Sequence, residues 1–290
     1  MTKGLKIVIA LCVASLPTTA QQDLSKVEIT TTKVSGNIYM LQGAGGNIGV
    51  SAGDDGILIV DDQYAPLAPK IMAALVGISD QPVKFVLNTH YHGDHTGGNE
   101  VFGESAPIIA HTNVRKRLSS RADGKPPVPD SLPVITFDHH LTVHINGEDI
   151  RAVHFPNGHT DGDSVIFFTR SKVVHMGDNY FAGRFPYIDI DAGGSVRGLI
   201  RNVDKVIAEL PADTKVIPGH GPLSTMADLT AYRVMVEDAL KIVDQGLKSG
   251  RTLEQLQEDK VLDKYASWGW SFITADRFIA TLHRELTETN

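Results

Sequence analysis

Four side chains suited to metal binding lie within six residues, His90, His92, Asp94 and His95 in the run His-Tyr-His-Gly-Asp-His. The run follows an apolar segment, residues 83–88, that is typical of a buried strand. Three imidazoles and a carboxylate in a protein interior need a partner for their lone pairs, because burying unpaired polar groups is unfavourable. Imidazole and carboxylate ligands suit zinc above all, with iron and manganese next. The spacing therefore predicts a metal site rather than a solvated loop that happens to be rich in histidine.

Three further residues of ligand type lie downstream, each in a turn that contains glycine. His159 lies in Asn-Gly-His-Thr-Asp-Gly, Asp178 in Met-Gly-Asp-Asn and His220 in Pro-Gly-His-Gly. Each turn follows a segment that is typical of a strand, so a rigid sheet would hold an exposed backbone in place. If these strand ends gather at one edge, seven candidate ligands converge there.

The elements that must position these residues are short strands and amphipathic helices. Strands are predicted for residues 37–42, 47–52, 56–60, 83–88, 107–110, 132–137, 141–145, 148–154, 164–169 and 172–175. Helices are predicted for residues 65–76, 112–119, 196–207 and 227–247. This order predicts one layered α/β domain over residues 21–290. The proline-rich segment 125–129 is interpreted as a connector in preference to a flap over the site.

The first twenty residues are typical of a secretion signal. Lys3 and Lys6 give a positive start, residues 7–16 form an apolar stretch too short to span a bilayer, and residues 18–20 are small enough for cleavage. We therefore expect export to the periplasm, with no stable membrane insertion once the signal is removed. Cys12 is the only cysteine, so the mature chain would have neither disulfides nor a thiol nucleophile.

The charge balance bears on the partners of the protein. The formal net charge is −7, and Lys and Arg form no basic stripe along the sequence. A nucleic-acid partner is disfavoured, because phosphate recognition needs clustered basic side chains. We expect a small-molecule substrate, and the sequence leaves the oligomeric state open.

The seven candidate ligands occur in an order that resembles the metallo-β-lactamase superfamily. Its signature is His-x-His-x-Asp-His followed by separate His, Asp and His turns, and the match extends from Asp61 to His220. The resemblance implies an α/β fold of four layers, the αββα sandwich, with two zinc ions at one edge and iron or manganese as alternatives. It also assigns the ligands. The first metal would be held by His90, His92 and His159, the second by Asp94, His95 and His220, with Asp178 bridging the pair.

The resemblance further implies the chemistry. A hydroxide shared by two zinc ions, whose bound water has a pKa of about 7, would attack a carbonyl carbon. Asp94 is the candidate catalytic residue, since it could pass a proton to the leaving group in addition to binding metal. Asp61 resembles the family's acidic residue that orients a ligand histidine. A helix cap or turn residue is an equal alternative for Asp61.

Departures from the best-known β-lactamases leave the substrate open. Those enzymes place cysteine at the position of Asp178, and many have arginine at that of His95. Arg184 and Tyr187 are candidate substrate contacts, although an ordinary surface arginine and a packing tyrosine would look the same in sequence. The aromatic residues Trp268, Trp270 and Phe272 are expected to pack the last helix against the body in preference to lining the cleft.

These observations favour an exported binuclear zinc hydrolase with β-lactams as the best single substrate. Hydrolysis of a lactone, thioester or phosphoester is the alternative within the same chemistry. An iron-dependent persulfide dioxygenase of the same fold is less favoured, because it would need only one metal. A metal-binding module without catalysis is least favoured, because the ligand set is complete.

Overall fold

The computed structural model describes residues 23–120 and 126–288. The expected signal segment, residues 1–20, therefore lies outside the described residues, as does Lys125 at the start of the proline-rich loop. Within the described part of the chain, no helix is long and apolar enough to cross a membrane.

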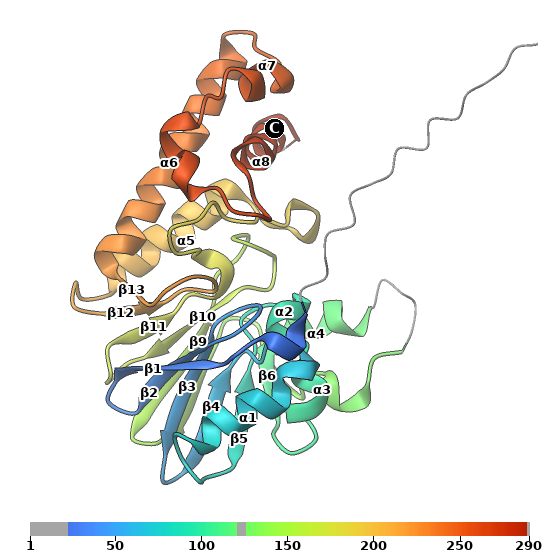
Figure 1. Cartoon of the computed structure of the whole chain (residues 1–290), viewed down its shortest axis with the longest axis vertical. Coiled ribbons are helices and arrows are strands. Elements are labelled where there is room, and N and C mark those ends of the chain that lie inside the picture. Colours follow the sequence, from blue (N-terminus) through green and yellow to red (C-terminus); the bar gives the residue numbers. More distant parts are fainter. Residues whose placement is uncertain (1–22, 121–125, 289–290) are drawn as a thin grey trace, which may run out of the picture.

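A seven-stranded sheet forms the N-terminal half, with its strands side by side in chain order (Figure 1). Its strands are β1 (Thr30–Ser35), β2 (Ile38–Gln42), β3 (Ile48–Gly53), β4 (Gly56–Val60), β5 (Val83–Leu87), β6 (Ile108–His111) and β7 (Ile135–Phe137). The pairs from β1 to β4 are antiparallel, and those from β4 to β7 are parallel.

A six-stranded sheet forms much of the C-terminal half, in the order β13-β12-β11-β10-β9-β8. Its strands are β8 (His140–Ile145), β9 (Glu148–His154), β10 (Ser164–Phe168), β11 (Val173–His175), β12 (Lys215–Ile217) and β13 (Ser224–Thr225). The pair of β11 and β12 is parallel, and the other pairs are antiparallel.

Helices lie outside the sheets. The α-helices are α1 (Ala68–Val76), α2 (Gly93–Thr96), α3 (Asn99–Phe102), α4 (Thr112–Ser119), α5 (Val196–Glu209), α6 (Met226–Lys248), α7 (Leu253–Glu258) and α8 (Ala275–Glu288). Short 3-10 helices lie at Leu24–Lys26, Ala65–Leu67, Pro129–Ser131, Gly177–Asn179, Ile190–Ala192 and Asp263–Trp268. Ser195 caps α5 by accepting a hydrogen bond from the Gly198 amide, as the sequence predicted.

Three separate hydrophobic clusters show that the molecule has four layers. Alternate residues of β10 divide between two of them, because successive side chains of a strand point to opposite faces. Ile166 and Phe168 pack between the two sheets, whereas Val165 and Phe167 pack against α5, α6 and α8. On the far side, Ile71 of α1 packs in a third cluster against the outer face of the first sheet. The predicted αββα sandwich is confirmed.

Most predicted elements end within one or two residues of their predicted bounds, and two predictions differ more. The strand expected at residues 132–137 begins only at Ile135, because Pro133 has no amide hydrogen to pair with β6. The helix expected at residues 65–76 is a 3-10 turn followed by α1, and its apolar Met72 and Val76 are 46% and 70% exposed. Only one side of α1 faces the sheet, so Met72 and Val76 remain exposed to solvent.

The two sheets meet along the edge where their parallel strands end. The Ser164 amide donates to the Thr89 carbonyl at 2.8 Å, and the Asn47 amide donates to the Gly219 carbonyl at 2.7 Å. Parallel neighbours end at the same edge of a sheet, so the turns after β4 and β5 face those after β11 and β12.

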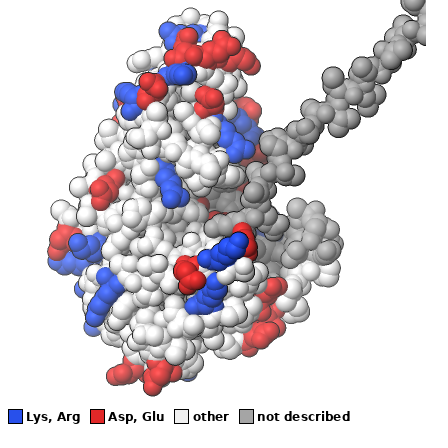
Figure 2. Space-filling view, viewed as in Figure 1, with Lys and Arg blue, Asp and Glu red and all other residues white. Residues whose placement is uncertain are grey.

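Figure 2 shows the same view of the surface. On this face, acidic and basic side chains are interspersed and form no continuous patch of one sign.

Candidate metal centre

The run of residues 90–95 begins just beyond β5 and changes from extended to helical backbone at its middle. His92 is extended (φ −63°, ψ 146°) and immediately precedes α2, which contains Asp94 and His95. The extended part therefore presents His90 and His92, and the first turn of α2 presents the other pair. His159 lies between β9 and β10, Asp178 follows β11, and His220 follows β12.

The structure brings all seven predicted ligands together. Their ligand atoms form three groups, each within 4.8 Å, namely His90 with His92 and His159, His90 with His95 and Asp178, and Asp94 with His95 and His220. The first and third groups contain the residues that the resemblance assigned to the first and second metal. We call them the three-histidine subsite and the aspartate subsite.

Asp178 lies between the two subsites. Its Oδ1 is 3.1 Å from Nε2 of His95, and its Oδ2 is 3.5 Å from Nε2 of His159 and 3.4 Å from Nε2 of His220. The carboxylate is buried, and Oδ1 has no hydrogen-bond partner, although a buried polar atom normally has one. A bridging position between two cations would satisfy both of its oxygens.

Two imidazole nitrogens face each other in the three-histidine subsite. Nδ1 of His92 lies 2.8 Å from Nε2 of His159. Each ring uses its other nitrogen as a donor, His92 to the Asp189 carboxylate at 3.0 Å and His159 to the Tyr187 carbonyl at 2.7 Å. The facing nitrogens of two neutral rings would thus both carry lone pairs. Nε2 of His90 is buried beside them without a hydrogen-bond partner. A cation could accept the lone pairs of all three nitrogens.

The aspartate subsite has spacing that suits tetrahedral coordination. Nε2 of His95 and Nε2 of His220 are 3.4 Å apart, and two nitrogens on a tetrahedral zinc ion lie about 3.3 Å apart. Asp94 Oδ2 is 3.3 Å from His220 Nε2. These groups can therefore hold divalent metal ions, in agreement with the chemistry of the donors.

Burial and neighbouring charges give the two subsites different proton affinities. Burial lowers the pKa of His159 to about 4 and lowers that of His90 well below its usual value. Burial acts in the same direction on His220, but Asp178 and Asp94 outweigh it and raise the pKa of His220 to about 9. The same two carboxylates, together with Asp61, raise the pKa of His95 despite its burial.

Asp61 supports a histidine of each subsite. Its Oδ2 accepts a hydrogen bond from Nδ1 of His95 at 2.7 Å and another from the Thr89 hydroxyl at 2.7 Å. The Thr89 oxygen in turn lies 3.0 Å from Nδ1 of His90. Asp61 is fully buried with φ of 64°, and no helix begins at it, so its contacts are those of an orienting carboxylate and not of a helix cap.

Asp189 is a supporting residue that the sequence did not reveal. Its Oδ2 accepts hydrogen bonds from Nε2 of His92 at 3.0 Å and from the Tyr91 hydroxyl at 2.7 Å. Its own amide donates to the His159 carbonyl at 3.0 Å. Asp189 thus fixes the tautomer of His92 and the turn that contains His159. Nothing in the spacing of Ile-Asp-Ile-Asp-Ala distinguishes it from Asp191, which is exposed and pairs with Arg284.

Two glycines allow the backbone to approach the ligands. A Cβ atom at Gly46 would lie 2.1 Å from Cε1 of His95, and one at Gly219 would lie 2.0 Å from Oδ1 of Asp178. Both approaches are too close for any side chain, so these turns require glycine.

A cavity of about 750 Å³ opens above both subsites. Its lining includes His92, Asp94, Asp178 and His220. Arg184 and Tyr187 also line it, as do Trp270 and Phe272, which we had expected to pack in the body. Trp268 and Trp270 also pack against the cluster around α6 as expected, with the Trp268 ring 6.4 Å from Tyr232, whereas Phe272 does not.

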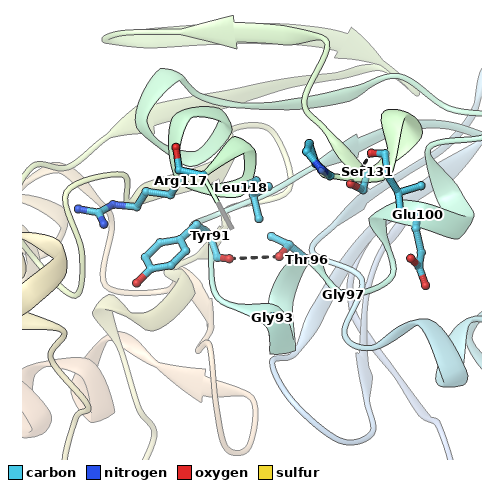
Figure 3. Close-up of a pocket in the computed structure, with 11 residues that line it drawn as sticks. Tyr91, Gly93, Thr96, Gly97, Glu100, Arg117, Leu118 and Ser131 are labelled. Atoms are coloured by element: carbon cyan, nitrogen blue, oxygen red, sulfur yellow. Dashed lines mark hydrogen bonds between the residues drawn. The ribbon is translucent and has the colours of Figure 1, made fainter. Parts of the chain in front are cut away.

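A second cavity, of about 590 Å³, lies on the other side of the metal-binding run. Tyr91, Thr96 and Arg117 line it together with Pro127 of the proline-rich segment, and none of the seven candidate ligands is in its lining (Figure 3). The Thr96 hydroxyl donates to the Tyr91 carbonyl at 3.2 Å across its wall. This segment therefore borders a cavity that is separate from the one above the subsites.

The remaining histidines near the site have structural explanations. His175 is fully buried in β11, where Nε2 donates to the Asn47 carbonyl at 2.9 Å and Nδ1 accepts from the Gly177 amide at 3.1 Å. It is a core histidine whose two ring nitrogens are both satisfied. His139 and His140 are exposed.

Sequence comparison links the chain to enzymes of several specificities. Over 180 residues it is 27% identical to an uncharacterized protein of Aquifex aeolicus, covering 60% of this chain and 83% of the relative. It is 26% identical over 219 residues to a hydroxyacylglutathione hydrolase of Gloeobacter violaceus, covering 72% and 77%. It is 26% identical to the 2,4-dinitroanisole O-demethylase subunit alpha of a Nocardioides species, covering 53% of this chain but only 47% of that protein.

Two solved structures share the fold. The DIM-1 metallo-beta-lactamase aligns with a TM-score of 0.62 at 20% identity, over 74% of this chain and 100% of its own. A double mutant of the sec-alkyl sulfatase PisA1 aligns with a TM-score of 0.68 at 14% identity, over 89% of this chain and 50% of its own. Residues 31–220, which hold every candidate ligand, match the sequence profile of the Metallo-beta-lactamase superfamily. With this match and the confirmed sandwich fold, the chain belongs to the metallo-β-lactamase superfamily of metal-dependent hydrolases.

Proposed function

We propose that the protein is an exported binuclear zinc hydrolase that opens an amide or ester carbonyl, with β-lactams as the first substrates to test. One observation carries the proposal. Two complementary groups of ligand atoms, linked by a third group of His90, His95 and Asp178, lie under a single open cavity. Cavities of this volume accommodate small-molecule substrates.

Each part of the proposed mechanism has a residue in this chain. One metal would be held by the three-histidine subsite, His90, His92 and His159. The other would be held by the aspartate subsite, Asp94, His95 and His220. Asp178 would contribute to both. Such a pair supplies a nucleophilic water at neutral pH and polarises a carbonyl oxygen. The side chain of Asp94 is 26% exposed and lines the cavity, so it can hold a proton next to the leaving group. Arg184 and Tyr187 also line the cavity, where a substrate would contact them.

A thioester substrate is the second candidate. The chain is similar to two hydroxyacylglutathione hydrolases and, over 146 residues at 27% identity, to an atrochrysone carboxyl ACP thioesterase of Aspergillus fumigatus. These names describe enzymes that act on thioesters, whereas the structural neighbour DIM-1 is a β-lactamase. The same metal chemistry can hydrolyse a β-lactam or a thioester. The residues that line the cavity must therefore determine which of the two substrates binds.

The test begins with metal content and continues with a substrate panel. Purified protein should contain two zinc ions per chain and hydrolyse at least one of a penicillin, a cephalosporin, a carbapenem, a lactone, a thioester and a phosphodiester. One iron per chain, together with persulfide oxidation, would instead support the dioxygenase. Two zinc ions without β-lactam turnover would remove the β-lactam assignment alone.

Export is a separate part of the proposal and rests on residues 1–20 of the sequence. A fusion of these residues to a reporter enzyme, expressed in a Gram-negative host, should appear in the periplasmic fraction with the signal removed. Retention of the full-length fusion in the cytoplasm would contradict it.

A further inference from the structure

The residues that line the cavity above the subsites include two unlike groups. One group consists of candidate metal ligands. The other consists of four aromatic residues and one arginine, namely Phe181, Arg184, Tyr187, Trp270 and Phe272. We call this second group the aromatic wall.

The rings of the aromatic wall connect a ligand of the aspartate subsite to one of the three-histidine subsite. The Trp270 ring is 6.2 Å from that of His220 and 5.5 Å from that of Phe272. The Phe272 ring is 5.3 Å from that of Tyr187, which is 5.7 Å from that of His92. The indole of Trp270 is fixed, because Nε1 donates to the Phe185 carbonyl at 3.0 Å. Phe272 is 45% exposed and lines the cavity, so an apolar group bound there could cover its ring.

Arg184 gives the wall a positive charge. Among the described residues that line the cavity, it is the only lysine or arginine. Its guanidinium lies 5.2 Å from the centre of the Trp270 ring, and no carboxylate in residues 23–120 or 126–288 forms an ion pair with it. A guanidinium stacked on an indole keeps its donors in a plane that matches a carboxylate.

Two of the five wall residues lie outside the region shared with the superfamily. The matched region ends at residue 220, whereas Trp270 and Phe272 belong to the segment between the last 3-10 helix and α8. This segment is held by α8, whose buried Glu285 accepts from the Ser195 hydroxyl and the Val196 amide, each at 3.0 Å. The elements α6, α7 and α8 lie together beyond the second sheet (Figure 1). The wall can therefore give this chain a selectivity of its own.

We propose that the site selects small amphiphilic anions, with a carboxylate or comparable anionic group on Arg184 and an aryl or bulky apolar group on Trp270 and Phe272. The bond to be broken would then lie over the metal subsites. The inference rests on the proposed function for the reaction and on the wall for the choice of substrate. It applies equally to a β-lactam, a lactone or a thioester.

Binding of three matched probes to the zinc-loaded protein tests the proposal. The probes are 4-phenylbutyrate, its neutral amide and butyrate, and calorimetry gives their dissociation constants. We expect 4-phenylbutyrate to bind about tenfold more tightly than either, because one charge-assisted contact or one buried ring is worth at least that factor. Arg184→Gln should abolish the preference over the amide, and Phe272→Ala the preference over butyrate.

Arg251→Gln is the control, because Arg251 is exposed, pairs with Asp259 and does not line the cavity. It should leave both preferences unchanged. Zinc content and far-UV circular dichroism establish that each variant is folded and loaded.

The proposal is overturned if the unaltered protein shows no preference or if either preference survives its substitution. Survival of the carboxylate preference in Arg184→Gln would mean that the probe binds the metals directly. The binding ratios do not depend on turnover. If the protein binds the probes as expected but hydrolyses nothing on the substrate panel, the proposed function is wrong and the proposed role of the aromatic wall stands.

Discussion

The three-histidine subsite and the aspartate subsite differ in charge, in proton affinity and in the source of their support. His90, His92 and His159 are neutral donors, whereas the other subsite includes the carboxylate of Asp94. Asp189 supports the first through His92, and Asp61 supports the second through a direct bond to His95. The difference teaches that two adjacent sites built from similar residues need not bind or lose metal together.

Asp178 is the residue whose loss should affect both subsites most. Asp178→Ala removes the carboxylate that contacts histidines of each, so we expect zinc content to fall below one ion per chain and hydrolysis to fall about 1000-fold or more. Mass spectrometry of the metal and kcat/KM on the best substrate measure the two effects. A variant that kept one ion at unchanged affinity would show that the carboxylate does not couple the subsites. Asp191→Asn, a change at the surface, is the control.

His220→Ala should separate the subsites. His220 contributes only to the aspartate subsite, so zinc content should fall from two ions to one while the three-histidine subsite keeps its ion. Titration of the metal-free variant with Co²⁺ would show one class of site in the visible spectrum. Loss of both ions, or retention of both, would contradict the division of ligands.

The two supporting carboxylates should act most strongly on different subsites, because Asp61 reaches the three-histidine subsite only through Thr89 and His90. Asp189→Asn keeps an oxygen that can accept from the Ala192 amide but loses a charged acceptor for His92, so affinity should fall about 10–100-fold at the three-histidine subsite only. Asp61→Asn should lower affinity at the aspartate subsite by a similar factor.

Competition with a chelator measures these affinities, and nitrogen NMR of the metal-free protein reports the His92 tautomer directly. Equal losses at both subsites in both variants, or an unchanged tautomer in Asp189→Asn, would indicate a general loss of structure. Asp191→Asn is again the neighbouring control.

The smallest expected effect is a difference in pH dependence. Without metal, the pKa of His220 is about 9 and that of His95 is raised, so protons must leave before zinc binds the aspartate subsite at pH 7. Its affinity should therefore fall by about tenfold per pH unit for each proton as the pH drops below 9. The pKa of His159 is about 4 and that of His90 is lowered, so these two ligands release no proton at pH 7.

Calorimetry in buffers of different ionisation enthalpy counts the protons released. Equal release at the two subsites would contradict the difference in proton affinity. Measurements on His220→Ala isolate the contribution of the three-histidine subsite.

The sequence predicted the ligand set because its signal is local. Four ligands lie within one run, and each of the others lies in a glycine turn after a strand. Strand and helix patterns placed those turns, and the layers followed from the order of elements. β4 and β9 have the predicted bounds. Each is a run of continuous or alternating apolar residues with a turn at its end, so the pattern defines where the strand begins and ends.

The resemblance pointed to Asp61, Arg184 and Tyr187, but Asp189 and the positions of Trp270 and Phe272 in the wall were beyond the sequence because they depend on contacts between distant segments. Asp189 is nearly a hundred positions from His92, and Phe272 lies beyond all seven ligands in the sequence. An aspartate or an aromatic residue in an irregular segment has no periodicity to mark its role. The bond from Trp270 to the Phe185 carbonyl and the contacts of α8 with the start of α5 hold this segment in place.

The meeting of the two sheets at the metal centre has a consequence for the stability of the whole chain. His90 and His92 belong to the first half, whereas His159, Asp178 and His220 belong to the second, and a single cysteine cannot form a disulfide within the chain. Ions held by ligands from both halves would join them as a cross-link that forms only in the folded chain. Because such binding stabilises the native state in proportion to the logarithm of the free metal concentration, zinc supply would set the melting temperature of the protein as well as its activity.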